Sequence, residues 1–558
     1  MTRRPPVASL AVVLWCHITI GMPTLGAQDT PASAWGRAHD SNGASSAATA
    51  SWLGAWSPLR PVLDVPRGLL RAPLAPGVLE APPPMTGAFV LAGAPGAIAR
   101  DLRPWLAGDT ARWSELRVRE SGEVGSYRRP LDVGDAAVTQ AIGQGWAPVG
   151  TRGVALGRFI LDRERHDAGG FTQRVAPYWS SPFIVTDSIS PPMQRTRVRL
   201  EGAIGWQVAG FGLGVSAGLE SRDRNSQNVP LRRSGRAATP AALVGVDRSL
   251  PWFGLVIGGY YKWSEANETN VLNAVPLPTI LYQLQGYDEP FGSLVTSSNP
   301  VFVRNDRQLR AAGGTAQLTV LGARVVLAHE QADRAEDQYR NLVSGNRATD
   351  RWRATGGTSH LQLSRALGTA HRATLVASRT SLTGSASRAD LTGIAVDGRD
   401  EQTAVEFDVR ATRGRWTTAL LGGVSQRRHE RVDYVVERRT ALDITTPFVG
   451  GELARRIARG GVAVGASLAS RSAAGGIPPV PEPTSAPTYR RLLQPELAYE
   501  SAASRAVAAW TTVRVPVASQ WLVLSARAER ATPTSTGANR LQPTGERTVW
   551  SVGLGWQR

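Results

Sequence analysis

The fold is decided by residues 548–556, which read Thr-Val-Trp-Ser-Val-Gly-Leu-Gly-Trp. Large apolar side chains occupy the even positions from Trp550 to Trp556, and small or polar residues occupy most of the odd positions. Side chains alternate between the two faces of a β-strand, so a period of two predicts one apolar face and one small or polar face. A strand of a soluble sandwich can show the same pattern, and the rest of the chain has to decide between the two.

The same alternation recurs along the chain. Residues 198–208 carry apolar side chains on even positions, and residues 211–219, 253–263 and 405–409 carry them on odd positions. Charged side chains fall on the opposite parity of these segments, where a barrel would have its interior. They are Arg197, Arg199, Glu201, Glu220, Lys262, Glu406, Asp408 and Arg410.

An export signal precedes the strands. Arg3 and Arg4 begin it, residues 7–20 are mostly apolar, and Leu25-Gly26-Ala27 forms a small-residue cleavage site, which predicts a signal peptide over residues 1–27. Beyond it we find no run of about 18 apolar residues, which argues against membrane-spanning helices. An exported chain with alternating strands predicts an antiparallel transmembrane β-barrel, with its apolar face toward lipid and its polar face toward the lumen.

The connections between the predicted strands alternate in length. Short connections near Gly210, Gly322 and Gly368 separate longer ones such as 164–193 and 265–306. Short periplasmic turns and long outer loops are typical of such barrels, so the spacing predicts roughly 14–16 strands within residues 111–558. The stretch from Tyr489 to Val515 leaves open whether residues 501–504 form a turn or part of one long strand.

Residues 28–110 differ in composition. Segments such as Ala81-Pro82-Pro83-Pro84 are rich in proline and alanine, and proline removes backbone donors that regular structure needs. We expect a partly disordered periplasmic extension. The alternative is that this segment folds back as a plug in the lumen.

Charge and cysteine content narrow the partners. The formal net charge is +18, and Lys262 is the only lysine, so arginine supplies almost all of the positive charge. In an exported barrel, guanidinium groups suit phosphorylated headgroups, so we expect outer-membrane lipid and lipopolysaccharide as partners and no nucleic acid. The only cysteine, Cys16, lies in the predicted signal, which excludes disulfide and thiolate chemistry from the mature chain.

The signal, the alternating strands and the aromatic-rich final strand resemble those of Gram-negative outer-membrane β-barrel proteins. This resemblance covers residues 113–558 and implies location in the cell outer membrane and insertion by the barrel-assembly machinery. The segments Tyr178-Trp179-Ser180-Ser181-Pro182-Phe183 and Tyr282-Gln283-Leu284-Gln285-Gly286-Tyr287, with the hairpin after Arg197 between them, resemble an uncharacterised family of such barrels.

Short motifs that are typical of catalytic or metal sites give little support for such a site in this sequence. Gly214-Val215-Ser216-Ala217-Gly218 matches the nucleophile elbow of hydrolases, but that elbow needs a strand-to-helix turn and here lies within an alternating strand. His329-Glu330 is a possible proton-transfer pair, and solvation of both is the simpler interpretation. No histidine spacing resembles a zinc site. We therefore expect no enzyme activity, no cofactor and no metal.

The functional expectation rests on the lumen and the longest loop. The eight charged residues named above are the lumen-lining candidates, and Tyr282, Tyr287 and Phe291 are loop candidates for a small solute or a partner protein. The leading hypothesis is a passive channel, or an accessory component, for solute passage across the outer membrane. The alternative is a surface-exposed binding or structural barrel with a closed lumen, and an outer-membrane hydrolase ranks third.

Overall fold

A computed structural model of the chain describes residues 113–557 with gaps in the connections. The predicted signal peptide and the predicted extension over 28–110 both lie outside the described residues. Within 113–557 the undescribed positions are 128–134, 151–152, 168–182, 188–191, 210, 227–230, 251–254, 275–278, 286–290, 296–300, 322, 341–347, 369, 389–390, 392, 436, 458–459, 477–493, 519 and 535–544.

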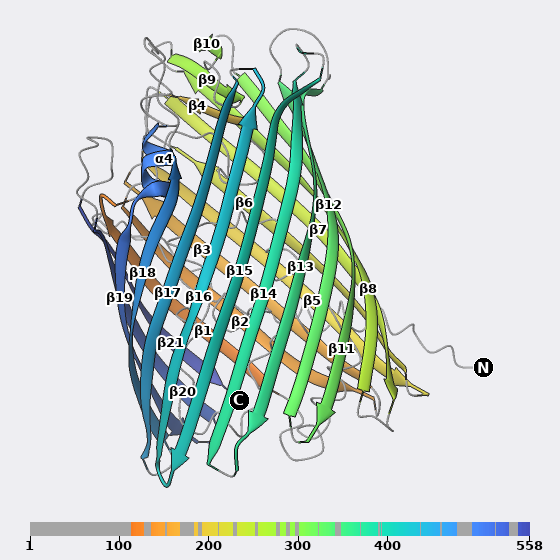
Figure 1. The fold of residues 1–558 in the computed structure, drawn as a ribbon, viewed down its shortest axis with the longest axis vertical. Coiled ribbons are helices and arrows are strands. Elements are labelled where there is room, and N and C mark those ends of the chain that lie inside the picture. Colours follow the sequence, from red (N-terminus) through yellow and green to blue (C-terminus); the bar gives the residue numbers. More distant parts are fainter. Residues whose placement is uncertain are drawn as a thin grey trace. The chain divides into compact units, whose positions relative to one another are not determined.

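The described residues form an antiparallel barrel of 18 strands (Figure 1). Each strand pairs with the next along the chain, and the first strand also pairs with the last, which closes the wall. The prediction of an antiparallel transmembrane β-barrel is confirmed. The barrel strands are β1 (Trp113–Gly125), β2 (Ala136–Val149), β3 (Gly153–His166), β5 (Met193–Val208), β6 (Phe211–Asn225), β7 (Leu231–Leu250), β8 (Leu255–Ala274), β11 (Val301–Val320), β12 (Ala323–Arg340), β13 (Ala348–Ala366), β14 (His371–Arg388), β15 (Ile394–Arg413), β16 (Trp416–Asp433), β17 (Arg438–Ile457), β18 (Gly460–Gly476), β19 (Ser504–Val517), β20 (Gln520–Pro533) and β21 (Arg547–Gln557).

The barrel has more strands than the 14–16 expected from the sequence. The difference lies near the start, where β1, β2 and β3 occupy a region in which no clear turn signals separate the strands. In β2 the larger apolar side chains Val138 and Ile142 are buried, while the neighbouring Thr139 is exposed. The hydrophobic alternation of β2 is therefore inverted, and a lipid-facing pattern cannot be recognised there.

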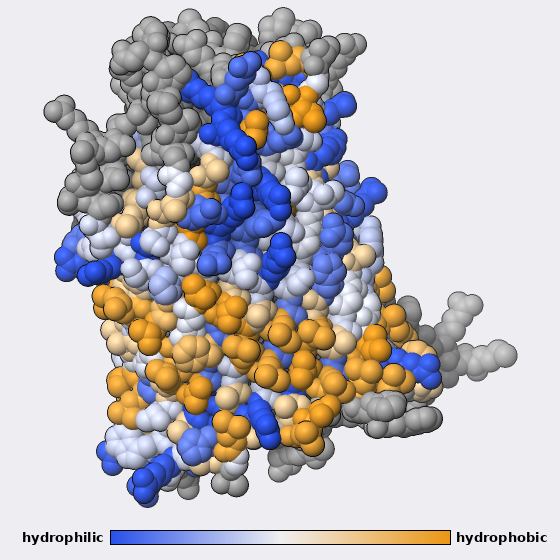
Figure 2. Space-filling view, viewed as in Figure 1, coloured by the Kyte–Doolittle hydropathy of each residue, from blue (hydrophilic) through white to orange (hydrophobic). Residues whose placement is uncertain are grey.

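Burial follows the predicted parity in the final strand. Val552, Leu554 and Trp556 are exposed on the outer wall, whereas Ser551, directly before Val552 and on the other parity, is buried. Ile257, Val405 and Phe407 are likewise exposed, whereas Lys262 and Glu406, which lie on the other parity of the same two strands, are buried. Apolar side chains on the visible wall gather in a band across its lower half (Figure 2). Such a band on the outside of a closed barrel is the surface that meets the hydrocarbon of a membrane.

The wall continues well above this band. Strand β15 has 20 residues, which at about 3.3 Å per residue and a tilt of about 40° spans roughly 50 Å along the barrel axis. An apolar band is about 25 Å tall, so part of each long strand stands outside the hydrocarbon. There the visible outer face is largely polar (Figure 2). This is why β8 and β11 extend into 265–306, which the alternation alone assigns to a loop.

Short and long connections lie at opposite ends of the barrel, as their alternation predicts. The turns β5–β6, β11–β12 and β19–β20 are tight and lie at the end where β1 begins and β21 ends. The long connections lie at the opposite end. Two of them contribute a three-stranded antiparallel sheet, formed by β4 (Phe183–Asp187), β9 (Thr279–Gln285) and β10 (Phe291–Val295).

A short helix, α4 (Gln494–Ser501), lies between β18 and β19. It answers the question left open by the sequence, because residues 494–501 are helical and β19 begins at Ser504. None of the helices in the described ranges is long and apolar enough to cross a membrane.

Candidate functional site in the barrel interior

The charged side chains predicted to line the lumen are withdrawn from solvent. Those of Arg197, Arg199, Glu220, Lys262, Glu406 and Asp408 belong to residues that are buried, and Arg410 is half-buried. Glu201 lies in β5, opposite Arg158 of β3 and Gly218 of β6, but its side chain is not among those described.

Ion pairs on the wall join several of these residues to near neighbours. Arg197 Nε lies 3.2 Å from Asp162 Oδ2 on the adjacent strand β3. Arg199 Nε lies 3.9 Å from Glu220 Oε2 on β6. Within β15, Arg410 Nη2 lies 3.0 Å from Asp408 Oδ2. Each of these cations is thus neutralised along the wall, by a carboxylate on its own or an adjacent strand.

Lys262 reaches farther. Its Nζ lies 2.5 Å from Glu330 Oε1, and the hydroxyl of Tyr260 donates a hydrogen bond of 2.7 Å to Glu330 Oε2. Lys262 and Tyr260 are on β8 and Glu330 is on β12, with β11 between them. The ring of Tyr260 crosses β11 at Gly313, where a Cβ atom would overlap it. Glycine at this position lets an aromatic side chain lie directly over the backbone.

A second contact of the same kind lies elsewhere in the wall. The indole Nε1 of Trp510 on β19 donates a hydrogen bond of 3.0 Å to Glu452 Oε2 on β17, across strand β18. The ring lies over Gly465, where a Cβ would again overlap it. Both arrangements use an inward glycine to connect strands that are not neighbours.

Sequence reasoning missed the most buried ion pairs. Arg307 Nη2 lies 2.6 Å from Glu268 Oε2, and its Nε lies 3.1 Å from Glu336 Oε2. These three side chains, on β11, β8 and β12, are at most 4% exposed. Glu268 and Arg307 lie in segments without apolar–polar alternation, so the sequence pattern did not indicate that their side chains point inward. The only available hint was that several alternate positions are polar, namely Ser264, Glu268 and Asn270 in one segment and Asn305 and Arg307 in the other.

Further charges extend this inner network. Arg427 Nη2 on β16 lies 2.8 Å from Asp400 Oδ2 on β15. Asp400, Glu330 and Arg334 line one small enclosed cavity of about 30 Å³. On this measure about 10–15 Å³ is enough to hold one water molecule, so the cavity has room for water, and its lining offers both donors and acceptors. Residues of β12, β13, β14 and β15 therefore line a polar pocket, and two of them, Glu330 and Asp400, are the carboxylates that pair with Lys262 and Arg427.

Helix α4 is held at the end of the barrel that carries the long connections. Arg471 of β18 donates hydrogen bonds to three backbone carbonyl oxygens, those of Tyr499 at 3.0 Å, Ala502 at 2.8 Å and Glu500 at 2.5 Å. A cation at the carboxyl end of a helix stabilises its unpaired carbonyl groups. Tyr499 also packs 5.0 Å, between ring centroids, from Tyr127. Both rings belong to one buried cluster with Phe448, Ala469, Ala506 and Ala531.

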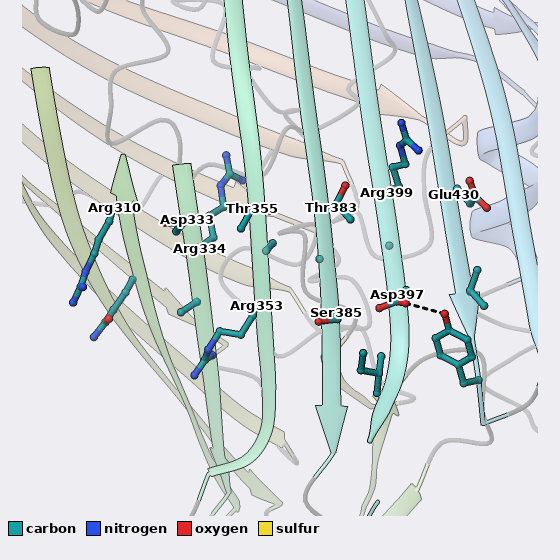
Figure 3. Close-up of a pocket in the computed structure, with 18 residues that line it drawn as sticks. Arg310, Asp333, Arg334, Arg353, Thr355, Thr383, Ser385, Asp397, Arg399 and Glu430 are labelled. Carbon is teal, nitrogen blue, oxygen red and sulfur yellow. Dashed lines mark hydrogen bonds between the residues drawn. The ribbon is translucent and has the colours of Figure 1, made fainter. Parts of the chain in front are cut away.

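The outer wall carries a hollow of its own. It has a volume of about 900 Å³ and lies on six adjacent strands, β11 to β16 (Figure 3). Arg310, Arg353 and Arg399 are exposed at its edge. The hydroxyl of Tyr434, in the connection after β16, donates a hydrogen bond of 2.8 Å to Asp397 Oδ2, and this bond raises the pKa of Tyr434 above its ordinary value.

The two candidate catalytic motifs do not form active sites in the described residues. His329 points outward and forms a 2.9 Å hydrogen bond between its Nδ1 and Ser359 Oγ, whereas Glu330 points inward to Lys262. Ser216 is buried in the middle of β6, with no strand-to-helix turn. No group of three potential metal ligands occurs within the part of the chain that is described.

The loop candidates are only partly placed. Tyr282 lies in β9, paired with Thr186 of β4 and Gly292 of β10, and Phe291 begins β10, paired with Gln283. The side chains of Tyr282 and Phe291, and the whole of Tyr287, lie outside the described atoms.

Together, the closed wall, the outer apolar band and the polar interior define an outer-membrane β-barrel protein. The chain belongs to a family of unknown function, DUF6850, whose model matches residues 105–557. The expected resemblance to an uncharacterised barrel family is confirmed. No curated protein matches the chain.

Solved barrels show a distant likeness. The ferric yersiniabactin uptake receptor FyuA from Yersinia pestis is 10% identical with a TM-score of 0.42, and the match covers 79% of each chain. The ferric preacinetobactin receptor BauA from Acinetobacter baumannii is 8% identical with a TM-score of 0.35, over 79% of this chain and 80% of the receptor. At such scores the likeness gives no information about a ligand of this chain.

Proposed function

We propose that this protein sits in the cell outer membrane and provides a passive route, or part of one, for a small polar solute. The observation that carries the proposal is the polarity of the interior. Charged side chains face inward from β3, β5, β6, β8, β12, β15 and β16, whereas the outer wall at membrane height is apolar. Charges without water or partners cost several kcal/mol to bury, so such an interior must be hydrated or networked.

A closed binding barrel is the second candidate, and the ion pairs favour it. Arg307, Glu268 and Glu336 form a dry cluster, and Arg471 fixes α4 against the inside of the wall. If such contacts continue across the interior, the barrel holds a partner with its loops and conducts nothing. We rank this candidate below the first because charged pairs could be replaced by apolar packing in a barrel that never admits water.

Single-channel recording of the purified protein in a planar bilayer separates the two candidates. The passive route predicts discrete conductance steps in the wild-type protein. Arg471→Met removes the three hydrogen bonds that hold α4 and should raise the conductance or its open fraction. Deleting residues 277–291 tests whether the long connection that carries β9 narrows the mouth. Silence of the wild type and of both variants would reject the passive route and promote the binding barrel.

The proposed orientation places the long connections outside the cell. The predicted mature chain contains no cysteine, so a single introduced cysteine can be labelled without background from other thiols. Leu391, in the β14–β15 connection, and Arg415, in the β15–β16 turn, are both exposed and lie at opposite ends of the barrel. A maleimide that does not cross membranes should label Leu391→Cys in intact cells and spare Arg415→Cys until the outer membrane is opened. The reverse pattern would overturn the orientation.

A further inference from the structure

A lipid-sized groove runs over the outer wall at membrane height. It has a volume of about 900 Å³ and lies across five neighbouring strands, β8, β11, β12, β13 and β14, with a contribution from β15. Ile257, Leu327 and Leu361 line its apolar part. Ile257 and Leu327 are about half exposed, so the groove opens toward the surroundings of the barrel.

The groove exists because one strand presents small side chains between strands that present large ones. Ala312, Gly314 and Ala316 are alternate residues of β11, and all three face outward. In the register, Gly314 lies beside His329 of β12 and Gly259 of β8. A Cβ on Gly314 would meet only a backbone oxygen at 3.6 Å. The backbone therefore does not require glycine there, and the absence of a side chain creates room on the outside.

Polar groups mark the edge of the groove nearest the long connections. His329, Ser359, Arg379 and Thr403 form one row across β12, β13, β14 and β15. The Arg379 side chain is 63% exposed, and its Nη2 lies 3.8 Å from Glu401 Oε2. Arg399 also pairs with Glu401, so two guanidinium groups share one carboxylate. This row keeps positive charge available immediately above the apolar slot.

The hollow of Figure 3 lies farther along the same strands, on the side away from the apolar band. On β12, for example, Leu327 and His329 line the groove, whereas Asp333 lines the hollow. The hollow is bordered by hydroxyl and charged groups, among them Thr355, Thr383 and Arg399 (Figure 3). The apolar groove, the row that contains Arg379 and the polar hollow thus follow one another along these strands, in the direction away from the apolar band.

We propose that this face binds a phosphorylated, acylated sugar of the outer leaflet, namely the lipid A part of lipopolysaccharide. One acyl chain would lie in the groove beside Leu327 and Leu361, a phosphate would meet Arg379, and the sugar would lie toward Thr383 and Arg399. Arginine recognises phosphate through paired N–H donors, which makes it the preferred residue for such a headgroup. The inference rests on the orientation proposed above, since only the outer leaflet carries this glycolipid.

Two variants test the parts of the site separately. Gly314→Trp fills the groove without backbone overlap, and Gly451→Trp is its control, because Gly451 lies on the outer face of β17 and a Cβ there meets only a backbone oxygen at 3.5 Å. Arg379→Glu reverses the phosphate contact. Arg455→Glu is its control, since Arg455 is exposed at the opposite edge of the wall, over the ring of Trp416.

The measurement is native mass spectrometry of the refolded full-length protein in detergent, titrated with bis-phosphorylated, hexa-acylated lipid A or with phosphatidylglycerol. We expect lipid A to remain bound to the wild type and to both controls. Gly314→Trp and Arg379→Glu should each lower its affinity by about tenfold. Equal lipid A binding by all five proteins would overturn the site, and equal retention of phosphatidylglycerol would overturn its assignment to a glycolipid. Because the assay needs no conductance and no orientation, its failure is distinguishable from failure of the proposed function.

Discussion

The ammonium nitrogen of Lys262 on β8 lies 2.5 Å from a carboxylate oxygen of Glu330 on β12, although β11 stands between the two strands. In the register, Lys262 is opposite Ala311, which is in turn opposite Ala332. Because Ala311 and Gly313 are small, no large side chain on the inner face of β11 blocks Lys262 and Tyr260, and both can reach across this strand. The only lysine of the chain thus ties together strands that share no backbone hydrogen bonds.

Breaking this pair should be costly. Glu330→Gln leaves the Lys262 ammonium buried without its counter-charge, and loss of one partner of a buried pair costs about 3–5 kcal/mol. We expect a matching fall in the free energy of unfolding, measured by urea titration in detergent with the heat-modifiable band shift as readout. The double variant Glu330→Gln, Lys262→Met should recover part of the loss because no charge is then left alone.

The control is an exposed pair on the same wall. Arg353 Nη2 lies 2.8 Å from Asp337 Oδ1, and the two side chains are 50% and 29% exposed. Removing it with Asp337→Asn should cost about 0–1 kcal/mol. An effect of Glu330→Gln no larger than that of this control would contradict the role given to the Lys262 pair.

Two adjacent glycines of β11 should respond differently to the same change. Gly313→Ala places a methyl group against the ring of Tyr260, whereas Gly314→Ala places one on the open outer wall. We expect Gly313→Ala to break the hydrogen bond from Tyr260 to Glu330 and to lower the free energy of unfolding by about 1–3 kcal/mol. Gly314→Ala should change it little. Equal effects would mean that Tyr260 can move aside freely.

The lipid face can be tested at neighbouring positions of β8. Ile257 is half exposed on the outer wall, and Gly258 has the opposite parity. Ile257→Arg should lower the yield of folded barrel, because arginine on the lipid face costs about 2–4 kcal/mol near the midplane. Gly258→Arg should impair insertion into liposomes less. If both variants insert equally well, Ile257 does not face lipid.

The charge of the lumen should be adjustable through one ion pair. Arg197 and Asp162 neutralise each other within 3.2 Å. In a conducting barrel, Asp162→Asn removes one negative charge from the inner wall and should shift the reversal potential in a salt gradient toward anion preference, and Arg197→Gln removes one positive charge and should shift it toward cations. Both shifts should grow at low salt, where screening is weaker. Arg236→Gln, on the exposed outer wall, is the control, and shifts of the same size from it would exclude a lumen origin.

The strands of the wall could be predicted from the sequence where their lipid-facing side chains alternate with small or polar ones. In β21 and β15 one face contacts lipid and is apolar, and the other face carries small or polar groups, so apolar residues recur with a period of two. In β2, with Val138 and Ile142 turned inward, that pattern is reversed and the strand was missed. The outer parts of β8 and β11 were missed for another reason: above the membrane no face of a strand has to be apolar, and the hydrogen-bonded ladder continues without any alternation.

In the strands with a clear alternation, the sequence alone predicts which side chains point inward, because successive side chains of a strand point to opposite faces. Which inward charges meet was decided by the tertiary structure. Glu123 and Arg547 form a buried ion pair, 3.0 Å from Oε1 to Nε, only because the first and last strands close the barrel. Lys262 meets Glu330 across β11, where the residue opposite Lys262 is the small Ala311. Closure, register and the strand that lies between two partners are properties of the assembled wall, and no local pattern of residues encodes them.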